Sequence, residues 1–396
     1  MTPSTSPLSA KVLTVALLVG SPVLVLGQRL EQDRSHPPID ISGFYDSSHH
    51  WYDIKEEDRI IAPLPGQRRF ASDDVKNIAE NILLYQKLNG GWAKNYDMLA
   101  ILTPEQSEAL RNARGGQNTT FDNGATHAQI EYLARAWLKT KDARYADAAT
   151  RGIDFVLSAQ YPNGGWPQFF PDTSGYRKYI TFNDGAMIGV MELFRGIVRK
   201  ETRFAFVTGE RRKNVESAFN RGVDCILRCQ IKQGDALTAW CQQHHPADFH
   251  PESARTFELA SVTGKESAEI VLFLMSIDRP KKEIVFAVEA AVQWFEQSKI
   301  FGVRVEEVQA ETTQFIYHKS AIDRVVVNDP KAPPIWARFY ELGSNRPLFC
   351  NRDGRPVNSL AEVDRERRTG YAWYAYDPEE VLKRYPAWKR TNRPSK

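Results

Sequence analysis

The chain has 396 residues, with 52 Lys plus Arg against 49 Asp plus Glu, and a formal net charge of +3 at pH 7. This near balance excludes the coating of a polyanion by bulk positive charge, so recognition of an acidic ligand must be local. The sequence contains no lysine-rich tract, zinc-finger spacing or aromatic RNA-binding signature, which argues against nucleic acid as a partner.

The N-terminal end, residues 1–27, is predicted to be a signal peptide. An uncharged run from Val12 to Leu26 follows Lys11. It is short for a membrane span and has the size of the apolar core of a signal peptide. We therefore expect a secreted or periplasmic protein with no membrane attachment in its mature form. Residues 28–70, rich in Pro, His and aromatic side chains, are interpreted as an N-terminal extension, and residues 71–390 as one large helical domain.

Helical periodicity begins near Asp73, where apolar residues recur at helical spacing from Val75 to Tyr85. Further helices are predicted at about 124–139, 144–159, 185–199, 213–230, 263–277 and 283–299. The region 303–330 is the exception, because Val303–Val305, Phe315–Tyr317 and Val325–Val327 are predicted to form short strands in a cap. The fold class is therefore mainly α.

A repeat organises these helices. The segment Gln86–Trp92, QKLNGGW, recurs as QYPNGGW at Gln160–Trp166, and a degenerate third copy ends in Ala239–Gln242. The first two copies are each followed by an acid-amide-glycine-alanine turn, DNGA at 122–125 and NDGA at 183–186. A period of roughly 60 to 75 residues fits a helix pair plus a decorated loop. This pattern predicts an (α/α) toroid, an incomplete helical barrel with long loops.

The loop-rich stretch Tyr161–Met187 is interpreted as one wall of a saccharide-binding cleft. Its Gly-Gly turn is expected to leave Trp166, and in the earlier copy Trp92, free to face a sugar ring. Lys94, which follows Trp92 closely, is assigned to the same substrate-binding set. Asp184 stands at a loop-to-helix junction, where the simple alternative is a helix N-cap.

The two turns also offer oxygen ligands for a hard cation. Asp122, Asn123 and Asp184 supply carboxylate and amide oxygens, which Ca2+ prefers. The positive end of a helix dipole disfavours a cation, so we expect a weak site that the ligand completes. The carboxylate of a uronic acid would do so, while arginines with forked donors would hold the other acidic groups of a polyuronate.

Cysteine and histidine residues carry less information. Cys225, Cys229, Cys241 and Cys350 contain no Cys-x-x-Cys pair, and buried free thiols are the ordinary interpretation, although export would permit a disulfide such as Cys229–Cys241. The cluster of His244, His245 and His250 lacks the helical His-Glu-x-x-His pattern and an accompanying acidic cluster, so a transition-metal site is not expected.

From about Asp73 to Trp388 the sequence resembles the family 10 polysaccharide lyases, pectate lyases with an (α/α) toroid fold. The resemblance is carried by NGGWAKNYD (Asn89–Asp97), TTFDNGATHAQIEYLARAW (Thr119–Trp137), YPNGGWPQFFPD (Tyr161–Asp172), YITFNDGAM (Tyr179–Met187), TAWCQQHHP (Thr238–Pro246), PESARTFELAS (Pro251–Ser261) and, between Trp336 and Tyr374, WARFYEL, NRDG and ERRTGYAWY. The resemblance implies that residues 71–390 are a pectate lyase catalytic domain. It also implies an acidic polysaccharide, polygalacturonate or pectin, as the partner of a monomer.

The same resemblance implies anti-β-elimination on α-1,4-linked polygalacturonate, assisted by Ca2+. It assigns Asp122, Asn123 and Asp184 to the Ca2+ site and Arg255 to removal of the C5 proton. A free guanidinium is protonated to above about pH 12. An arginine base therefore requires an alkaline optimum or a pKa lowered by Ca2+ and by neighbouring arginines.

Further arginines match the family's uronate-binding positions. These are Arg352 and one of Arg367 and Arg368.

Three other functions use some of the same residues. A non-catalytic uronate-binding protein needs the same aromatic and basic side chains. A glycoside hydrolase on an α-toroid could use Asp122 and Asp184 as its acid and base if their carboxyl groups lay about 5–5.5 Å or about 6.5–9.5 Å apart. The Gln-x-x-x-Gly-x-Trp spacing also resembles the repeat of triterpene cyclases, but the sequence contains no Asp-x-Asp-Asp acid cluster for that chemistry.

Overall fold

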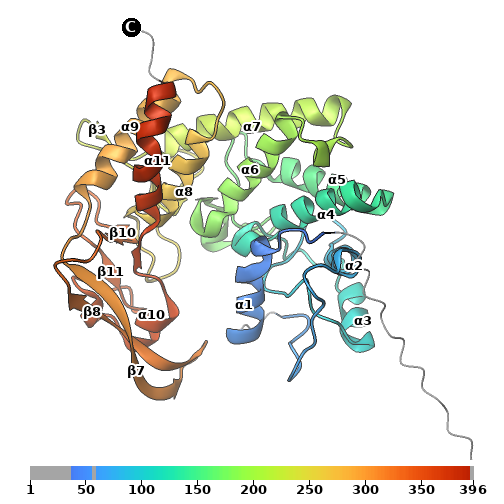
Figure 1. Ribbon diagram of the computed structural model, residues 1–396, viewed down its shortest axis with the longest axis horizontal. Helices are drawn as coiled ribbons and strands as arrows, with labels where there is room; N and C mark the ends of the chain where they lie inside the picture. Colours follow the sequence, from blue (N-terminus) through green and yellow to red (C-terminus); the bar gives the residue numbers. More distant parts are fainter. Residues whose placement is uncertain (1–36, 56–58, 393–396) are drawn as a thin grey trace, which may run out of the picture. The chain divides into compact units, whose positions relative to one another are not determined.

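A computed structural model describes residues 37–55 and 59–392 (Figure 1). The chain divides into the units Met1–Gln32 and Asp33–Lys396, and all described residues belong to the second unit. The predicted signal peptide, residues 1–27, lies outside the described residues. The helices are α1 (Tyr45–Asp53), α2 (Val75–Tyr85), α3 (Pro104–Asn112), α4 (His127–Thr140), α5 (Ala143–Ala159), α6 (Ala186–Val198), α7 (Gly209–Cys229), α8 (Lys265–Met275), α9 (Lys282–Gln297), α10 (Arg365–Gly370) and α11 (Asp377–Thr391).

The helices form two rows. The first row is α4, α6 and α8, and the second row is α5, α7 and α9, with neighbours in each row in contact. At one end α2 contacts both α4 and α5, and at the other end α11 contacts both α8 and α9. The hairpins α4–α5, α6–α7 and α8–α9 connect the two rows (Figure 1). Every helix predicted between residues 73 and 299 is present. This arrangement confirms the predicted incomplete (α/α) toroid.

A repeated glutamine joins α2 to α5, α5 to α7 and α7 to α9. Each of α2, α5 and α7 ends directly before this glutamine. The side-chain Nε2 donates to a carbonyl of the loop that follows and to a carbonyl of α5, α7 or α9, respectively. The bonds are Gln86 to Gly90 and Ala148 (2.9 and 2.9 Å), Gln160 to Gly164 and Ala218 (2.9 and 2.8 Å), and Gln230 to Thr238 and Ala287 (2.9 and 2.9 Å). The repeat in the sequence is therefore a repeat in hydrogen bonding.

A tryptophan completes each copy. Trp92, Trp166 and Trp240 have no exposed surface. Their indole Nε1 atoms donate to carbonyl oxygens in the last turn of the preceding helix, those of Ile82, Val156 and Ile226, at 2.8, 2.8 and 2.7 Å. We call each glutamine with its tryptophan a Gln–Trp bracket: Gln86 with Trp92, Gln160 with Trp166, and Gln230 with Trp240. Each bracket therefore fixes the start of the loop that follows α2, α5 or α7 in the same way, at the C-terminal end of the helix.

The main strands form one long hairpin. Strands β7 (Val303–Gln314) and β8 (Lys319–Asn328) pair antiparallel, and β8 packs on α10. The prediction of a strand at Phe315–Tyr317 is wrong, because Phe315 N donates to His318 O at 2.9 Å and closes the turn between the two strands.

The remaining strands of the described residues are two residues long. They are β1 (Ile180–Thr181), β2 (Lys232–Gln233), β3 (Ala236–Leu237), β4 (Gln243–His244), β5 (Pro251–Glu252), β6 (Val262–Thr263), β9 (Trp336–Ala337), β10 (Phe339–Tyr340), β11 (Phe349–Cys350), β12 (Pro356–Val357) and β13 (Tyr374–Ala375). All four cysteines are buried and free, so the structure contains no Cys229–Cys241 disulfide. No helix in the described part of the chain is long and apolar enough to cross a membrane.

Candidate active site

Two short 3-10 turns form the centre of the site. Turn η2 (Asp122–Gly124) precedes α4, turn η4 (Asn183–Gly185) precedes α6, and the two turns lie against each other. The middle residue of each turn has a left-handed backbone, with φ 51° at Asn123 and φ 48° at Asp184. Asn and Asp accept this conformation more readily than other residues with a side chain. The N-cap of α6 is Gly185 and receives no side-chain cap, so Asp184 is not the N-cap that the simple alternative supposed.

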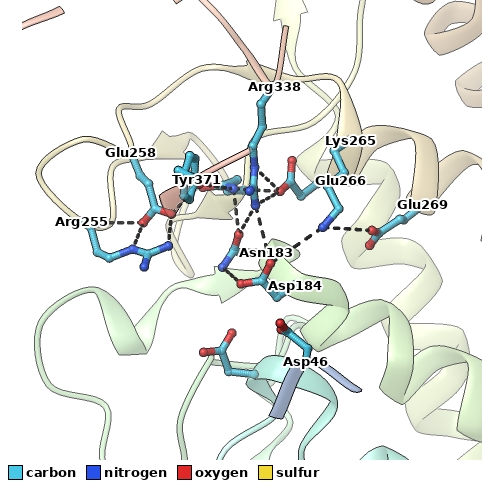
Figure 2. A network of polar contacts seen from close by, with 12 residues as sticks. Asp46, Asn183, Asp184, Arg255, Glu258, Lys265, Glu266, Glu269, Arg338 and Tyr371 are labelled. Carbon is cyan, nitrogen blue, oxygen red and sulfur yellow. Dashed lines mark hydrogen bonds and ion pairs between the residues drawn. The ribbon is translucent and has the colours of Figure 1, made fainter. Parts of the chain in front are cut away.

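Asp184 faces positive charge on one side. Its Oδ2 accepts from Asn183 Nδ2 at 2.7 Å, and its Oδ1 lies 3.6 Å from Arg338 Nη2 and 3.9 Å from Lys265 Nζ (Figure 2). Burial raises the pKa of the Asp184 carboxyl, but Arg338 and Lys265 outweigh burial and the net direction is downward. Asp184 is therefore ionised and available as an anionic ligand.

Asp122 is buried and only half satisfied. Its Oδ2 accepts from Lys94 Nζ at 2.6 Å, whereas its Oδ1 has no hydrogen-bond partner. The adjacent Asn123 donates from Nδ2 to Asn95 Oδ1 at 2.8 Å. A buried carboxylate oxygen without a partner is costly unless a ligand satisfies it. This oxygen and the ionised Asp184 fit the donor set of a hard divalent cation.

The carboxylates of the two turns do not enclose a cation by themselves. Within the described ranges, a single group of three or more His, Cys, Asp or Glu residues brings its ligand atoms within 4.8 Å of one another, and it is His245, Asp248 and His250. Asp122 and Asp184 are outside that group, which agrees with an open site that needs further ligands.

The exposed histidine cluster departs from the sequence analysis, which expected no acidic partners there. Asp248 Oδ1 lies 3.2 Å from His245 Nδ1 and 2.6 Å from His250 Nδ1, while Glu252 Oε1 lies 3.0 Å from His250 Nε2. His244 is separate, because it is buried and its Nδ1 lies 2.8 Å from Phe249 O.

Arg255 is held by Glu258. The guanidinium donates from Nε and Nη2 to the two carboxylate oxygens at 2.7 and 2.5 Å, and Tyr371 OH donates to Glu258 Oε1 at 2.7 Å. The Arg255 side chain is 41% exposed. Burial acts to lower the pKa of Arg255, but the Glu258 carboxylate raises it, and the net direction is well above the ordinary value. The charge that the described residues place closest to the Arg255 guanidinium is therefore the Glu258 carboxylate, and this favours the first of the two alternatives, an alkaline optimum.

Arg338 connects the Arg255 and Asp184 sides of the site. It is buried, donates from Nη2 to Glu266 Oε1 at 2.6 Å and to Asn183 Oδ1 at 2.9 Å, and lies 4.4 Å from the centroid of the Tyr371 ring. The sequence analysis assigned no site role to Arg338. Its ion pair with Glu266 joins residues 72 positions apart, so no local sequence pattern reveals it.

Lys265 and Glu269 lie on the α8 side of Asp184. Lys265 Nζ is 3.9 Å from Glu269 Oε1, the same separation as from Asp184. Burial raises the pKa of Glu269 to about 7, although Lys265 opposes this shift. The sequence analysis missed both residues, which stand in an apolar helix that otherwise belongs to the core.

The structure separates the remaining predicted arginines. Arg352 and Arg367 both pair with Glu366, from Nε at 2.8 and 2.7 Å, whereas Arg368 pairs with Asp323 of β8 at 2.6 Å. Burial raises the pKa of Glu366, but the hydrogen bonds from Arg352 and Arg367 outweigh burial and lower it to about 2.

Arg352 is the most open of the three arginines. Its side chain is 36% exposed, against 6% for Arg367 and 18% for Arg368. Arg367 and Arg352 also flank the ring of Phe257, at 4.8 and 5.3 Å from its centroid. Arg352 and Arg367 therefore share one carboxylate partner and one aromatic neighbour, whereas Arg368 has a different partner.

The predicted stacking residues need a correction. Trp92 and Trp166 are fully buried with their indole nitrogens hydrogen-bonded inside the fold, so neither can stack on a sugar ring. Gly152 and Gly222 leave room for these rings. A Cβ at Gly152 would lie 2.9 Å from the Trp92 ring, and a Cβ at Gly222 would lie 3.1 Å from the Trp166 ring. Lys94 does reach the site, through Asp122.

Comparison with known proteins places the chain in a family. A family model described as pectic acid lyase matches residues 86–382. A search among curated proteins gave no match. The structure is similar to two structures of a family 10 polysaccharide lyase from Cellvibrio cellulosa, each with 30% sequence identity.

One of these structures is an aspartate-to-alanine mutant in complex with trigalacturonic acid; its TM-score is 0.66, with 80% of this chain and 92% of that chain covered. The other has a TM-score of 0.65 and coverages of 80% and 91%. The family match spans most of the chain and includes both turns and the Arg255 loop. The chain therefore belongs to the pectic acid lyase family and is a pectate lyase of polysaccharide lyase family 10.

Proposed function

We propose that this pectate lyase cleaves α-1,4-linked polygalacturonate by Ca2+-assisted anti-β-elimination, with Arg255 as the base. The observation that carries this proposal is the polar network of Figure 2, which extends from the half-exposed Arg255 through Tyr371 and Arg338 to Asp184. A related lyase is in complex with trigalacturonic acid, and this supports an acidic polysaccharide as the substrate.

Asp122, Asn123 and Asp184 would hold the cation. When bound, Ca2+ draws negative charge from the uronate carboxylate and makes the C5 proton more acidic. The unpartnered Oδ1 of Asp122 and the ionised Asp184 are the oxygens that support this assignment. Lys94 and Lys265, on the two aspartates, would hold the sugar acid groups through their own positive charge.

Arg255 would take the proton from C5 of the sugar. The electron pair of the broken C5–H bond forms the C4–C5 double bond, and the glycosidic oxygen leaves C4 with the electrons of its bond and gains a proton from water. The two-point pairing with Glu258 keeps Arg255 protonated near neutral pH. Reaction through this base therefore demands alkaline pH, because only the neutral guanidine can accept a proton.

Arg352 and Arg367 would bind further uronates. Their shared Glu366 and their position over Phe257 hold both guanidinium planes in place. A rigid forked donor pair suits a carboxylate. We also propose that the mature protein acts outside the cytoplasm, as the uncharged run from Val12 to Leu26 suggests.

The deciding experiment mixes the mature protein with de-esterified polygalacturonate at alkaline pH and follows the ultraviolet absorbance of the unsaturated product. We expect a rise that depends on Ca2+ and stops when a chelator is added. New reducing ends without the absorbance rise would indicate a hydrolase using Asp122 and Asp184. Retained binding without cleavage would indicate a uronate-binding protein.

A further inference from the structure

Helix α1, from the N-terminal extension, forms part of the site wall. Its residue Ser47 donates from Oγ to the carbonyl of Asn123 at 3.0 Å, and Asn95 N donates to Ser47 Oγ at 3.3 Å. The carbonyl of Gly43 packs so closely on Gly124 that a Cβ there would lie 2.3 Å from it. These contacts attach α1 and the 3-10 turn before it, Ser42–Phe44, to η2, the turn that carries Asp122.

The C-terminal end of α1 is held as well. Trp51 is buried and donates from Nε1 to Ile61 O at 3.1 Å. Just after the helix, Lys55 N donates to Tyr317 O at 2.9 Å, in the turn between β7 and β8. Because both ends of α1 are anchored, the backbone of the helix has a fixed position relative to η2.

Asp46 lies between these anchors, directly before Ser47. Figure 2 shows its carboxylate on the side of Asp184 opposite to Arg338. Burial and the negative charges of Asp184 and Asp122 raise the pKa of the Asp46 carboxyl, while His50 and Lys265 oppose this shift. Its ion pair with His50 is long, at 4.0 Å, and its side chain is 52% exposed. Asp46 thus adds a third carboxylate beside Asp122, whose Oδ1 is already buried without a partner. The ligand atoms of Asp46, Asp122 and Asp184 do not all lie within 4.8 Å of one another, so the three side chains have to draw together around a cation, and the half-exposed Asp46 side chain leaves room for that movement.

Three carboxylates held near one another repel each other unless a cation lies between them. Ca2+ takes six to eight oxygen ligands, and its affinity rises with the number of charged ligands. Asp122 and Asp184 alone leave most of these positions open. A third carboxylate on an anchored helix supplies what the two turns lack.

We propose that Asp46 is a ligand of the same Ca2+ as Asp122 and Asp184. The residue comes from α1, which precedes the part of the chain that the family model matches, residues 86–382. The N-terminal extension is then a functional part of the enzyme. This inference rests on the calcium role proposed above and extends it to a residue that neither the family match nor the sequence repeat includes.

The experiment measures Ca2+ binding to the substrate-free protein by titration calorimetry for the wild type, Asp46→Asn, Asp184→Asn and Asp53→Asn. Asp53 is the matched control, because it lies on the same helix and pairs with a histidine, His49, one turn away. We expect Asp46→Asn to weaken Ca2+ binding roughly tenfold through the loss of one charged ligand. Asp53→Asn should bind as the wild type does.

A thermal melt separates ligation from a structural role. Loss of the Asp46 charge relieves repulsion, so Asp46→Asn should melt at the same or a higher temperature than the wild type without Ca2+ and gain less from added Ca2+. A lower melting temperature without Ca2+ together with an unchanged gain on adding Ca2+ would show a structural role and overturn the inference.

The outcomes also separate this inference from the calcium proposal. If Asp184→Asn weakens Ca2+ binding and Asp46→Asn does not, only the role of Asp46 is refuted. If the wild type binds no Ca2+ with or without oligogalacturonate, the calcium role itself is refuted, and the role of Asp46 falls with it.

Discussion

Arg255 and Glu258 form a two-point ion pair, with both carboxylate oxygens of Glu258 bonded to the guanidinium, at 2.7 and 2.5 Å. The partner that orients the proposed base also keeps it protonated. Glu258 is itself fixed by the Tyr371 hydroxyl. The position of the guanidinium and its pKa therefore cannot be changed independently of each other.

The pH dependence follows from this pair. The Glu258 carboxylate raises the pKa of Arg255, so the neutral form and the rate should increase as pH rises through the alkaline range. Glu258→Gln removes the charge and leaves an oxygen for Tyr371, and it should move the alkaline rise of kcat downward by about one to three pH units. The matched control is Glu341→Gln, in the exposed pair with Arg346. A pH–rate profile that Glu258→Gln leaves unmoved would argue against Arg255 as the titrating base.

Removal of the base should impair the rate more than binding. Arg255→Ala is expected to lower kcat by about 10²–10⁴-fold, the usual contribution of a positioned base. Binding of oligogalacturonate should stay measurable, because Arg352 and Arg367 lie on a separate carboxylate, Glu366. Kinetics of absorbance and calorimetric binding test this pair of expectations. Arg346→Ala, at an exposed site, should change neither quantity; substantial activity in Arg255→Ala would assign the base to another group.

Calcium dependence should localise to the two turns. Asp184→Ala is expected to raise the Ca2+ concentration for half-maximal rate about tenfold or more, because a charged ligand is lost. Asp154→Ala removes a carboxylate of α5 that pairs with Arg211 and serves as the control. The measurement is the rate against buffered free Ca2+. An identical Ca2+ curve for Asp184→Ala and the wild type would place the metal elsewhere.

The buried tryptophans should affect stability and not substrate affinity. Trp166→Ala empties a fully buried position and should lower the free energy of unfolding by about 3–5 kcal/mol. Trp166→Phe keeps most of the ring volume and should cost less while losing the bond to Val156 O. Urea unfolding measures the loss of stability, and an unchanged KM would show that substrate affinity is not affected. A large rise in KM with unchanged stability would restore a role in sugar stacking.

The sequence predicted seven helices, α2 and α4 to α9, because their apolar residues recur at the helical period, and it predicted the toroid because the Gln–Trp pattern repeats. It did not predict α1, α3, α10 and α11. It could not tell which way the tryptophans point. A Gly-Gly-Trp turn is equally compatible with an indole at a ligand and an indole in the core. The residues that indicate a buried indole are far from the turn in the sequence. They are Gly152 and Gly222, which lie within α5 and α7, where the tryptophan rings need space.

The charged core of the site could not be read from the sequence for a different reason. Arg338 forms an ion pair with Glu266, and its guanidinium donates to Asn183 Oδ1, a residue 155 positions away in the sequence. Such pairs depend on how distant loops meet, which no local pattern records. The position of Asp46 close to these turns was hidden in the same way, because the composition of its segment indicated only an extension. Turns η2 and η4 were predictable because each carries its own acid, amide and glycine.

The third Gln–Trp bracket shows how freely the loops can change. Its Gly-Gly turn has been replaced by the small hairpin β2–β3, yet Gln230 keeps both of its carbonyl bonds and Trp240 keeps its bond to Ile226. The hydrogen bonds of the bracket thus do not depend on the length or composition of the loop between the glutamine and the tryptophan. A loop from another lyase could therefore replace the segment between these two residues, and substrate preference could be changed while the helices stay in place.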